Sequence, residues 1–353
     1  MEALSSPPQH PAQTGGQPGW RLPPWTAAAG PPSSRLLLQQ LTHLAKRFDQ
    51  AVSAWSGILD DVMFVRELSS RIVELVRAHP EICLGMANRL ITRSTSIAHD
   101  FHVAVVAVLT AQAMDLEVKQ QLTIGRTALT MNLCSLRLHE DLSFSQQPLT
   151  LAQRVNLARH PLLAAELLSH TPGADLRWID AVEQHHESMD GTGYPFGLAG
   201  KDICIEARVV KAADLWCALV TPRATRLGKH PHHAMQELQE RERMRLDMMV
   251  LATMRRRLGN YPPGTLVRLA NRESAVVTGF ALGNSAPRHV VAIFNAAGEV
   301  LTRPVLRDTG KTAFAIRSYA NAPQSNTQSP DWEKVWSLVR STLSAVPEDA
   351  RIT

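Results

Sequence analysis

The stretch His185–Pro195, with the sequence HHESMDGTGYP, decides the fold assignment of this chain. Two adjacent histidines and a glutamate offer metal ligands, because neutral imidazole and carboxylate bind many metals in proteins. The following Asp-Gly-Thr-Gly-Tyr-Pro segment predicts a tight loop, since glycine adopts positive φ angles and proline is rigid. The stretch therefore predicts a metal site next to a shaped, aromatic loop.

The sequence on both sides of this stretch has helical periodicity, with apolar residues recurring every three or four positions. The predicted helices are Leu36–Trp55, Val62–Leu75, Leu84–Leu90, Ala98–Met114, Ile124–Leu138, a segment from Leu149 to a stop at Pro172-Gly173, Asp175–Gln184, Ile205–Leu219, and the second half of His230–Leu258. A polar loop is predicted at Asp141–Pro148. The helix Asp175–Gln184 would place His185 and His186 at its C-terminal end.

The pattern changes at Tyr261-Pro262-Pro263-Gly264, where short β-prone runs begin, separated by Gly, Asn and Pro. These runs are Val267–Leu269, Ala275–Val277, Val290–Phe294 and Ala313–Ile316. They predict a small appendage of four or five strands. A last amphipathic helix is predicted at Trp332–Leu343. The fold class predicted from these patterns is mainly α, a helical bundle with a small C-terminal β-rich appendage.

Composition and periodicity divide the chain into five segments. Residues 1–34 are rich in Pro, Gly, Ser and Gln and predict a disordered tail. N-terminal helices follow at 35–96, and the main helical domain is predicted at 97–259. The β-rich appendage occupies 260–320, and a linker with the C-terminal helix occupies 321–353.

Charge and cysteine use exclude several classes of protein. The net charge of +5 is modest and the arginines are scattered, so no nucleic-acid polymer is expected as a partner. The cysteines are isolated, with no CxxC pair and no signal peptide, which predicts a reduced, cytoplasmic protein. No apolar run approaches the roughly 20 residues that span a bilayer, so no membrane contact is expected.

Other histidines and one aspartate in the helical segments are further candidate ligands. Metal sites that cleave phosphodiesters need imidazoles and carboxylates that converge from several helices. The candidates are His99, His102, His160, His185, His186 and Asp214. A single histidine on an apolar helix is more often a core residue, so the grouping indicates a site more strongly than any one member.

Three motifs resemble the HD-GYP domain, a helical subfamily of the HD phosphohydrolase superfamily. They are HHESMDGTGYPFGLAG from His185, ARVVKAADLWCALVTPR from Ala207 and LTLAQRVNLARHP from Leu149. The resemblance covers residues 97–239, and residues 238–315 resemble the C-terminal extension of one branch of the family. It implies an HD-type helical bundle. Active members hydrolyse the bacterial messenger cyclic di-GMP, so the resemblance also implies a metal-dependent phosphodiesterase ancestry.

The resemblance assigns roles to individual residues. It implies a metal site with the ligands His160, His185, His186 and Asp214. His99 is a weaker match to a family histidine near the site. Arg223 stands where the family carries an arginine near the substrate phosphates.

The segment Gly193-Tyr194-Pro195 is a second functional feature, because it presents a stiff aromatic surface that suits contact with a partner. In the family this loop is associated with binding diguanylate cyclase (GGDEF) domains. The alternative role is to brace the helix of Asp214 against the histidine pair, and the two roles can coexist.

The motif that names the superfamily is lost. Where active members read approximately A-L-L-H-D-I-G-K, this chain reads ALTMNLCS, so Met131, Asn132 and Ser135 replace the histidine, the bridging aspartate and the lysine. A neutral amide and a soft thioether bind hard cations weakly. Activation of water by two metals is therefore expected to fail or to be severely reduced.

These observations predict a degenerate HD-GYP signalling protein that is catalytically impaired and acts through binding of a partner or of cyclic di-GMP. One divalent transition metal, iron or manganese, is the expected cofactor. A histidine trio that binds no metal and only holds helices together is an equally weighted alternative. A further alternative is a phosphohydrolase with residual activity on cyclic di-GMP or a related phosphoester.

Overall fold

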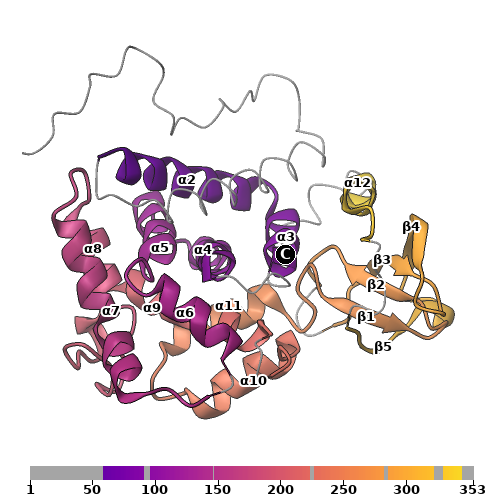
Figure 1. Cartoon of the computed structure of the whole chain (residues 1–353). Coiled ribbons are helices and arrows are strands. Elements are labelled where there is room, and N and C mark those ends of the chain that lie inside the picture. Colours follow the sequence, from indigo (N-terminus) through magenta and orange to yellow (C-terminus); the bar gives the residue numbers. More distant parts are fainter. Residues whose placement is uncertain are drawn as a thin grey trace, which may run out of the picture.

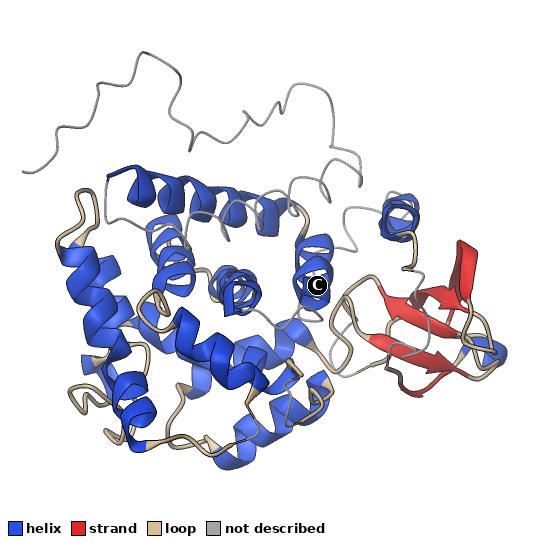
Figure 2. Ribbon diagram, viewed as in Figure 1, coloured by secondary structure: helices blue, strands red, loops and turns tan. Residues whose placement is uncertain are grey.

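A computed structural model describes residues 59–90, 96–145, 147–222, 226–281, 285–321 and 329–343. Within these residues a bundle of helices is followed by one small sheet and a last helix (Figures 1 and 2). The predicted mainly α fold with a C-terminal β-rich appendage is confirmed. The predicted tail at 1–34 and the predicted helix Leu36–Trp55 lie outside the described residues.

The helices of the bundle follow one another with short connections. In the described part of the chain they are α2 (Leu59–Ala78), α3 (Pro80–Leu90), α4 (Ser96–Ala113), α5 (Val118–Thr130), α6 (Leu136–Phe144), α7 (Leu151–Ser169), α8 (Leu176–Gln184), α9 (Ile205–Val220), α10 (Pro231–Arg241) and α11 (Met248–Leu258).

Helix α4 lies in the middle of the bundle, where Figure 1 shows it end-on below α2 and between α5 and α3. Every residue from Phe101 to Ala111 is buried. Helices α2, α3, α5, α9 and α11 all pack against it. A helix that is buried all round has no face for solvent and must be enclosed by other elements. This requirement explains why the other helices of the bundle surround α4.

One apolar core runs through the bundle from Val62 in α2 to Leu258 in α11 and includes Trp336 of the last helix. The N-terminal helices α2 and α3 therefore share a core with the helices that follow them. The sequence-based division of the bundle near residue 96 stays a prediction.

The sheet contains five antiparallel strands in the order β4-β3-β2-β1-β5. Their bounds are β1 (Leu266–Leu269), β2 (Ser274–Val277), β3 (His289–Phe294), β4 (Val300–Asp308) and β5 (Ile316–Tyr319). Helix α12 (Trp332–Leu343) has the predicted bounds and packs on β3 and β4. Its Val335 joins one apolar face of the sheet, so the appendage is a two-layer unit.

The predicted helix Ile124–Leu138 was wrong, because a turn at residues 131–135 separates α5 from α6. Helix α6 then continues to Phe144, into the predicted polar loop. Met131 is packed in the core, so the apolar periodicity continues through the turn and hides it. The turn has its own backbone hydrogen bonds, from Leu133 N to Thr130 O and from Ser135 N to Asn132 O.

Two strand predictions also needed correction. Strand β4 was missed because its sequence VLTRPVLRD contains Pro304, which argues against a central strand. The proline is tolerated because β4 is an edge strand of the sheet. The run Ala313–Ile316 is a 3-10 turn at Thr312–Phe314, and the strand starts only at Ile316.

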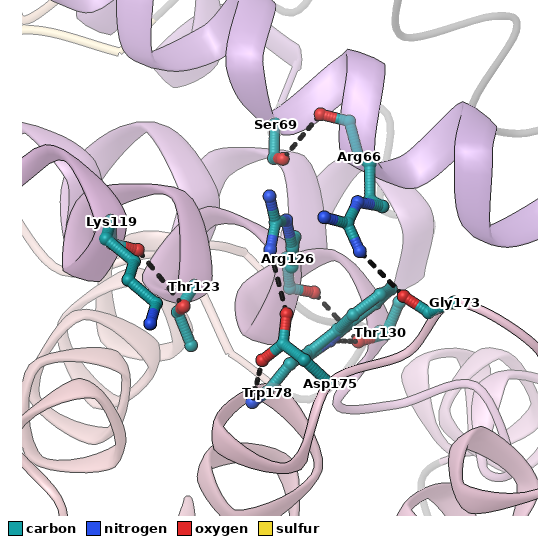
Figure 3. A network of polar contacts seen from close by, with 9 residues as sticks. All are labelled: Arg66, Ser69, Lys119, Thr123, Arg126, Thr130, Gly173, Asp175 and Trp178. Atoms are coloured by element: carbon teal, nitrogen blue, oxygen red, sulfur yellow. Dashed lines mark hydrogen bonds and ion pairs between the residues drawn. The ribbon is translucent and has the colours of Figure 1, made fainter.

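A polar network fixes the start of α8 against α5 (Figure 3). Asp175 caps α8 by accepting a hydrogen bond from Trp178 N at 3.1 Å, and it pairs with Arg126 at 3.2 Å. The buried Trp178 Nε1 donates to Thr130 Oγ1 at 2.9 Å. Because α8 is anchored at its first turn, the residues that follow its last turn, His185 and His186, have a defined position.

Candidate metal centre

Three histidines converge where the end of α8 meets the middle of α7. The ligand nitrogens of His160, His185 and His186 all lie within 4.8 Å of one another. His160 belongs to α7, and the other two directly follow α8. The structure thus brings together three of the four residues predicted as metal ligands.

The backbone sets the tautomers of two of these rings. His160 Nδ1 lies 2.6 Å from Leu157 O, and His185 Nδ1 lies 2.5 Å from Val182 O. A ring nitrogen at this distance from a carbonyl donates its proton, so Nε2 of each neutral ring carries a lone pair.

The two Nε2 atoms of His160 and His185 lie 3.1 Å apart. Two lone pairs that face each other repel, whereas a cation between them is bound by both. A hydrogen bond from the second ring nitrogen to a backbone carbonyl is also what metal-binding histidines usually have. The pair therefore fits a metal ion better than it fits a simple core contact.

Burial keeps these rings uncharged at neutral pH. Burial, together with the charge of His160, lowers the pKa of His185 to about 3. The pKa of His160 is also lowered by burial, and burial with the charge of His185 lowers the pKa of His186 well below its usual value. Neutral imidazole is the form that coordinates metals, so no proton has to leave before an ion binds.

Asp214, the fourth predicted ligand, is not within the 4.8 Å group. Its Oδ1 lies 2.8 Å from His99 Nε2, which joins α9 to α4. Burial alone would raise the pKa of Asp214, but the hydrogen bond and charge of His99, with the charges of His186 and His185, outweigh burial and lower it. Asp214 is thus an ionised carboxylate paired with His99.

The three replaced positions of the named motif make contacts inside the turn between α5 and α6. Met131 is buried in the apolar core. Asn132 Nδ2 donates a hydrogen bond to Asp100 Oδ1 at 2.7 Å, in a buried environment. Ser135 Oγ donates to Asn132 O at 3.2 Å. These side chains stabilise a turn, and the amide of Asn132 is engaged by a neighbouring carboxyl group.

Asp100 was missed by the sequence analysis. Burial raises its pKa to about 7, although His99 and the Asn132 hydrogen bond act in the opposite direction. The signal in the sequence was an aspartate beside His99, at the start of an otherwise apolar helix. An acid in such a helix is expected to be buried, and a buried acid needs a polar partner.

The Gly193-Tyr194-Pro195 segment folds back onto the histidine pair. A Cβ atom on Gly193 would lie 2.3 Å from Ser188 N, so only glycine allows this approach. The Tyr194 ring stacks on His186, with centroids 4.8 Å apart and planes 28° apart. The loop and the metal candidate are therefore in direct contact.

Two buried charged side chains hold the loop from inside. Glu187 accepts hydrogen bonds from Phe196 N at 2.6 Å and from Leu198 N at 3.0 Å. Lys211 of α9 donates to the carbonyls of His186 and Glu187 and to a neighbouring serine hydroxyl. Glu187 is thus satisfied by backbone partners, and Lys211 by backbone carbonyls and the serine hydroxyl, which fixes the loop relative to α9. Phe196 remains more than half exposed at 55%.

Comparison with known proteins gives the family. The sequence profile of the HD domain matches residues 71–250, slightly more than half of the chain. The chain belongs to the HD domain family. The predicted resemblance to HD-GYP proteins of the cyclic di-GMP phosphodiesterase type is confirmed by this match and by the named relatives below.

Relatives of this HD domain protein are named as cyclic di-GMP phosphodiesterases. The chain is 27% identical to PA4108 of Pseudomonas aeruginosa over 91% of its own length and 80% of that protein. It is 33% identical to the response regulator RpfG of Xanthomonas campestris pv. campestris, over 33% of this chain and 32% of that one. The solved HDG"Y"P protein Bd1817 of Bdellovibrio bacteriovorus shares the fold, with a TM-score of 0.53 and 15% identity over 65% of this chain and 73% of that chain.

Other predictions for the HD domain have simpler outcomes. Arg223, the predicted phosphate-binding residue, lies outside the described residues. His102 is buried and takes no part in the histidine group; neither of its ring nitrogens has a hydrogen-bond partner within the described part of the chain. No helix among the described residues is long and apolar enough to cross a membrane.

Gly193→Ala is expected to lower the free energy of unfolding by about 1–3 kcal/mol, because the added methyl group would overlap the backbone of Ser188. Urea unfolding followed by circular dichroism measures the change. Gly279→Ala is the matched control, since nothing lies within 4 Å of a Cβ atom there. Equal stability of the two variants would contradict the close approach.

Acid is expected to destabilise the protein partly through His102. Burial, with a smaller effect of the His99 charge, lowers its pKa from 6.5 to about 3, so between these pH values only the unfolded chain binds the proton. Stability from this group is present above pH 6.5 and falls by about 1.4 kcal/mol per pH unit below it. In the presence of a chelator, the free energy of unfolding of His102→Leu should fall less steeply between pH 7 and 5 than that of the wild type. A pH dependence equal to that of the wild type would contradict this expectation.

Proposed function

We propose that this HD domain protein is a degenerate HD-GYP signalling module, impaired as a phosphodiesterase, that acts by binding a partner or a cyclic dinucleotide. The observation that carries the proposal is the buried hydrogen bond from Asn132 to Asp100, at 2.7 Å. It lies at the position where active members of the family have the bridging aspartate. The amide of Asn132 is neutral and binds hard cations weakly, and its Nδ2 is engaged as a donor to Asp100, so it is a poor bridge between two cations.

Two-metal hydrolysis depends on ligands that hold both ions and on charge that stabilises the phosphate oxygens. Met131 is buried in the core and Ser135 bonds its own turn, so neither supplies a cation ligand or a phosphate counter-charge. Loss of a bridging anion is more severe than loss of an outer hydrogen bond, which by itself costs about 10–100-fold. These contacts support the proposal of impaired catalysis.

The histidine group supports a single metal ion in the proposed function. His160, His185 and His186 would hold it, in accord with the general metal dependence of HD phosphohydrolases. When bound, the ion would supply positive charge for an anionic ligand such as a phosphate. The protein's own residues keep the three rings neutral and oriented, and Asp214 adds a carboxylate nearby.

The ligand and partner follow from the relatives and from the loop. Relatives named as cyclic di-GMP phosphodiesterases support cyclic di-GMP as the ligand, with Arg223 as a proposed phosphate contact. The Gly193-Tyr194-Pro195 segment would be the contact for a signalling partner such as a GGDEF protein. The exposed Phe196 next to it supports that role.

The second candidate function is a single-metal phosphohydrolase with residual activity. The facing Nε2 atoms of His160 and His185 favour it, because an arrangement that suits a metal has been kept. The two candidates differ in whether water is activated at that ion.

Cyclic di-GMP turnover separates the candidates. The purified, metal-loaded protein is expected to bind cyclic di-GMP but to hydrolyse it at least about 100-fold more slowly than an active relative, given the lost ligands. Calorimetry measures binding, and chromatography of the linear product measures turnover. Slow turnover that needs the metal and is abolished by His185→Ala would support the second candidate, and turnover comparable to that of the relative would reject the impaired module.

The pair of Asp100 and Asn132 is expected to behave as a unit. Asn132→Asp alone should lower unfolding free energy by about 1–3 kcal/mol, because two carboxyl groups at a 2.7 Å contact must share a proton or repel. The double exchange Asp100→Asn/Asn132→Asp restores an amide–carboxylate pair and should recover most of that loss. Strictly additive effects in the double-mutant cycle would show that the two side chains do not interact.

A further inference from the structure

We propose that the outer side of α11 and of the turn before it is a docking surface for an acidic, partly apolar segment of a protein partner. The surface, called here the methionine–arginine face, consists of Arg243, Met244, Met248, Met249, Arg255 and Arg256. The inference rests on the proposed function, because it gives the partner of the Gly193-Tyr194-Pro195 segment a second contact and a stated chemistry.

Three methionines are exposed close together on this face. Met244 in the turn is 71% exposed, and Met248 and Met249 at the start of α11 are 44% and 72% exposed. Single exposed apolar residues are ordinary on a protein surface, but three within residues 244–249 form a patch. Methionine is unbranched and adapts its shape to a neighbour, which suits a docking surface.

The amphipathic pattern of α11 explains why these side chains point outward. The helix buries Val250, Leu251, Met254 and Leu258 in the core of the bundle. With about 3.6 residues per turn, positions 248, 249, 252, 255 and 256 then lie together on the opposite side, and all five are exposed. The apolar residues of that side have no partner in the fold that accounts for them.

The start of α11 is held firmly, so the face has a fixed shape. Asp247 caps the helix by accepting hydrogen bonds from Met249 N at 2.9 Å and Val250 N at 3.3 Å. The same carboxylate pairs with Arg208 of α9 at 2.7 Å. A surface that is already ordered loses little conformational freedom when a partner binds.

The charge of this face is positive. Glu242 and Asp247 are only partly exposed and pair with Arg245 at 3.2 Å and with Arg208. The exposed Arg243, Arg255 and Arg256, in contrast, form no ion pair with any residue that the structure describes.

These free arginines lie at both ends of the methionine patch. Met248 and Arg255 are two turns apart, which is about 10 Å along the helix. Arginines in a last turn also stabilise the helix end, so their charge alone would not indicate docking. Positive charge on either side of an exposed apolar patch complements a segment with carboxylates around apolar side chains.

The backbone of Met189 joins this face to the loop after the histidines. Met189 N donates to Arg245 O at 3.1 Å, and Met189 O accepts from Gly200 N at 3.1 Å. The turn before α11 and the loop are thus bonded to the same residue. A partner that covers both reaches a larger interface than the loop alone provides.

The side chains of the face favour a protein over other anionic partners. Residues 241–256 contain no aromatic residue, so the face has nothing on which nucleic-acid bases stack. It also exposes no tryptophan, phenylalanine or leucine, the residues that helices at a membrane surface insert.

The probe for the experiment is a synthetic helical peptide of about five turns, with leucines on one side and glutamates around them. A second peptide carries lysines in place of the glutamates. The full chain is titrated against each labelled peptide at about 0.15 M salt, and fluorescence anisotropy measures binding. We expect the acidic peptide to bind at least about 10-fold more tightly than the lysine peptide.

Two double variants test the arginines and the methionines. Arg243→Glu/Arg256→Glu should weaken binding of the acidic peptide at least about 10-fold, because attraction becomes repulsion. Met248→Ser/Met249→Ser should weaken it at least about fivefold through lost apolar contact. Circular dichroism checks that each variant is folded.

Each double variant has a matched control at exposed positions elsewhere. Arg154→Glu/Arg303→Glu makes the same change in net charge on α7 and β4, and Leu176→Ser removes a side chain of α8 that is 78% exposed. Each control should change the affinity by less than about threefold, because distant exposed charges are screened. Equal effects of the controls and the double variants would overturn the docking surface.

The other outcomes separate this inference from the proposed function. Loss of binding in Phe196→Ala, with both double variants unchanged, would confine the contact to the loop and overturn the face on α11. Binding to phosphatidylglycerol vesicles but not to the acidic peptide would overturn the protein partner. Cyclic di-GMP binding that persists without any peptide binding would overturn only this inference, whereas absence of both would overturn the proposed function as well.

Discussion

The structure depends on the burial of helix α4. Its residues from Phe101 to Ala111 have no exposed face. The chain therefore buries the most apolar surface when α2, α3, α5, α9 and α11 all pack against this helix. The first turn of this helix is polar, and His99 and Asp100 must find partners because they lie at the edge of the same core. They find Asp214 and Asn132, from two different elements.

The altered HD motif is best understood from this polar layer. Asp100 and Asn132 form a buried hydrogen bond with each other, which stabilises the turn between α5 and α6 and is the contact on which the proposed loss of catalysis rests. The histidines of α7 and α8 are arranged differently, since backbone carbonyls turn the lone pairs of His160 and His185 toward each other. Asn132 thus makes an internal contact, whereas His160 and His185 have the geometry of a ligand pair.

The loop after the histidines packs against them. Gly193 permits its backbone to approach that of Ser188 closely, and Tyr194 stacks on His186. Glu187 forms its hydrogen bonds with the loop, and Lys211 donates to the residues just before the loop. The surface that the loop presents is consequently linked by direct contacts to the state of the histidine group.

The sequence by itself determined the helical bundle, the bounds of α12, the His185–His186 pair and the glycine loop, because these depend on local periodicity and on a contiguous motif. The place of His160 beside this pair came from the resemblance to the HD-GYP domain. The sequence could not show the break at residues 131–135, because Met131 is as apolar in a turn as in a helix. It also did not reveal the partners of Asp100 and His99, which are Asn132 and Asp214, 32 and 115 residues away in the chain. Only the tertiary structure decided those pairings, since a side chain's partner is set by how helices pack and not by its position in the chain.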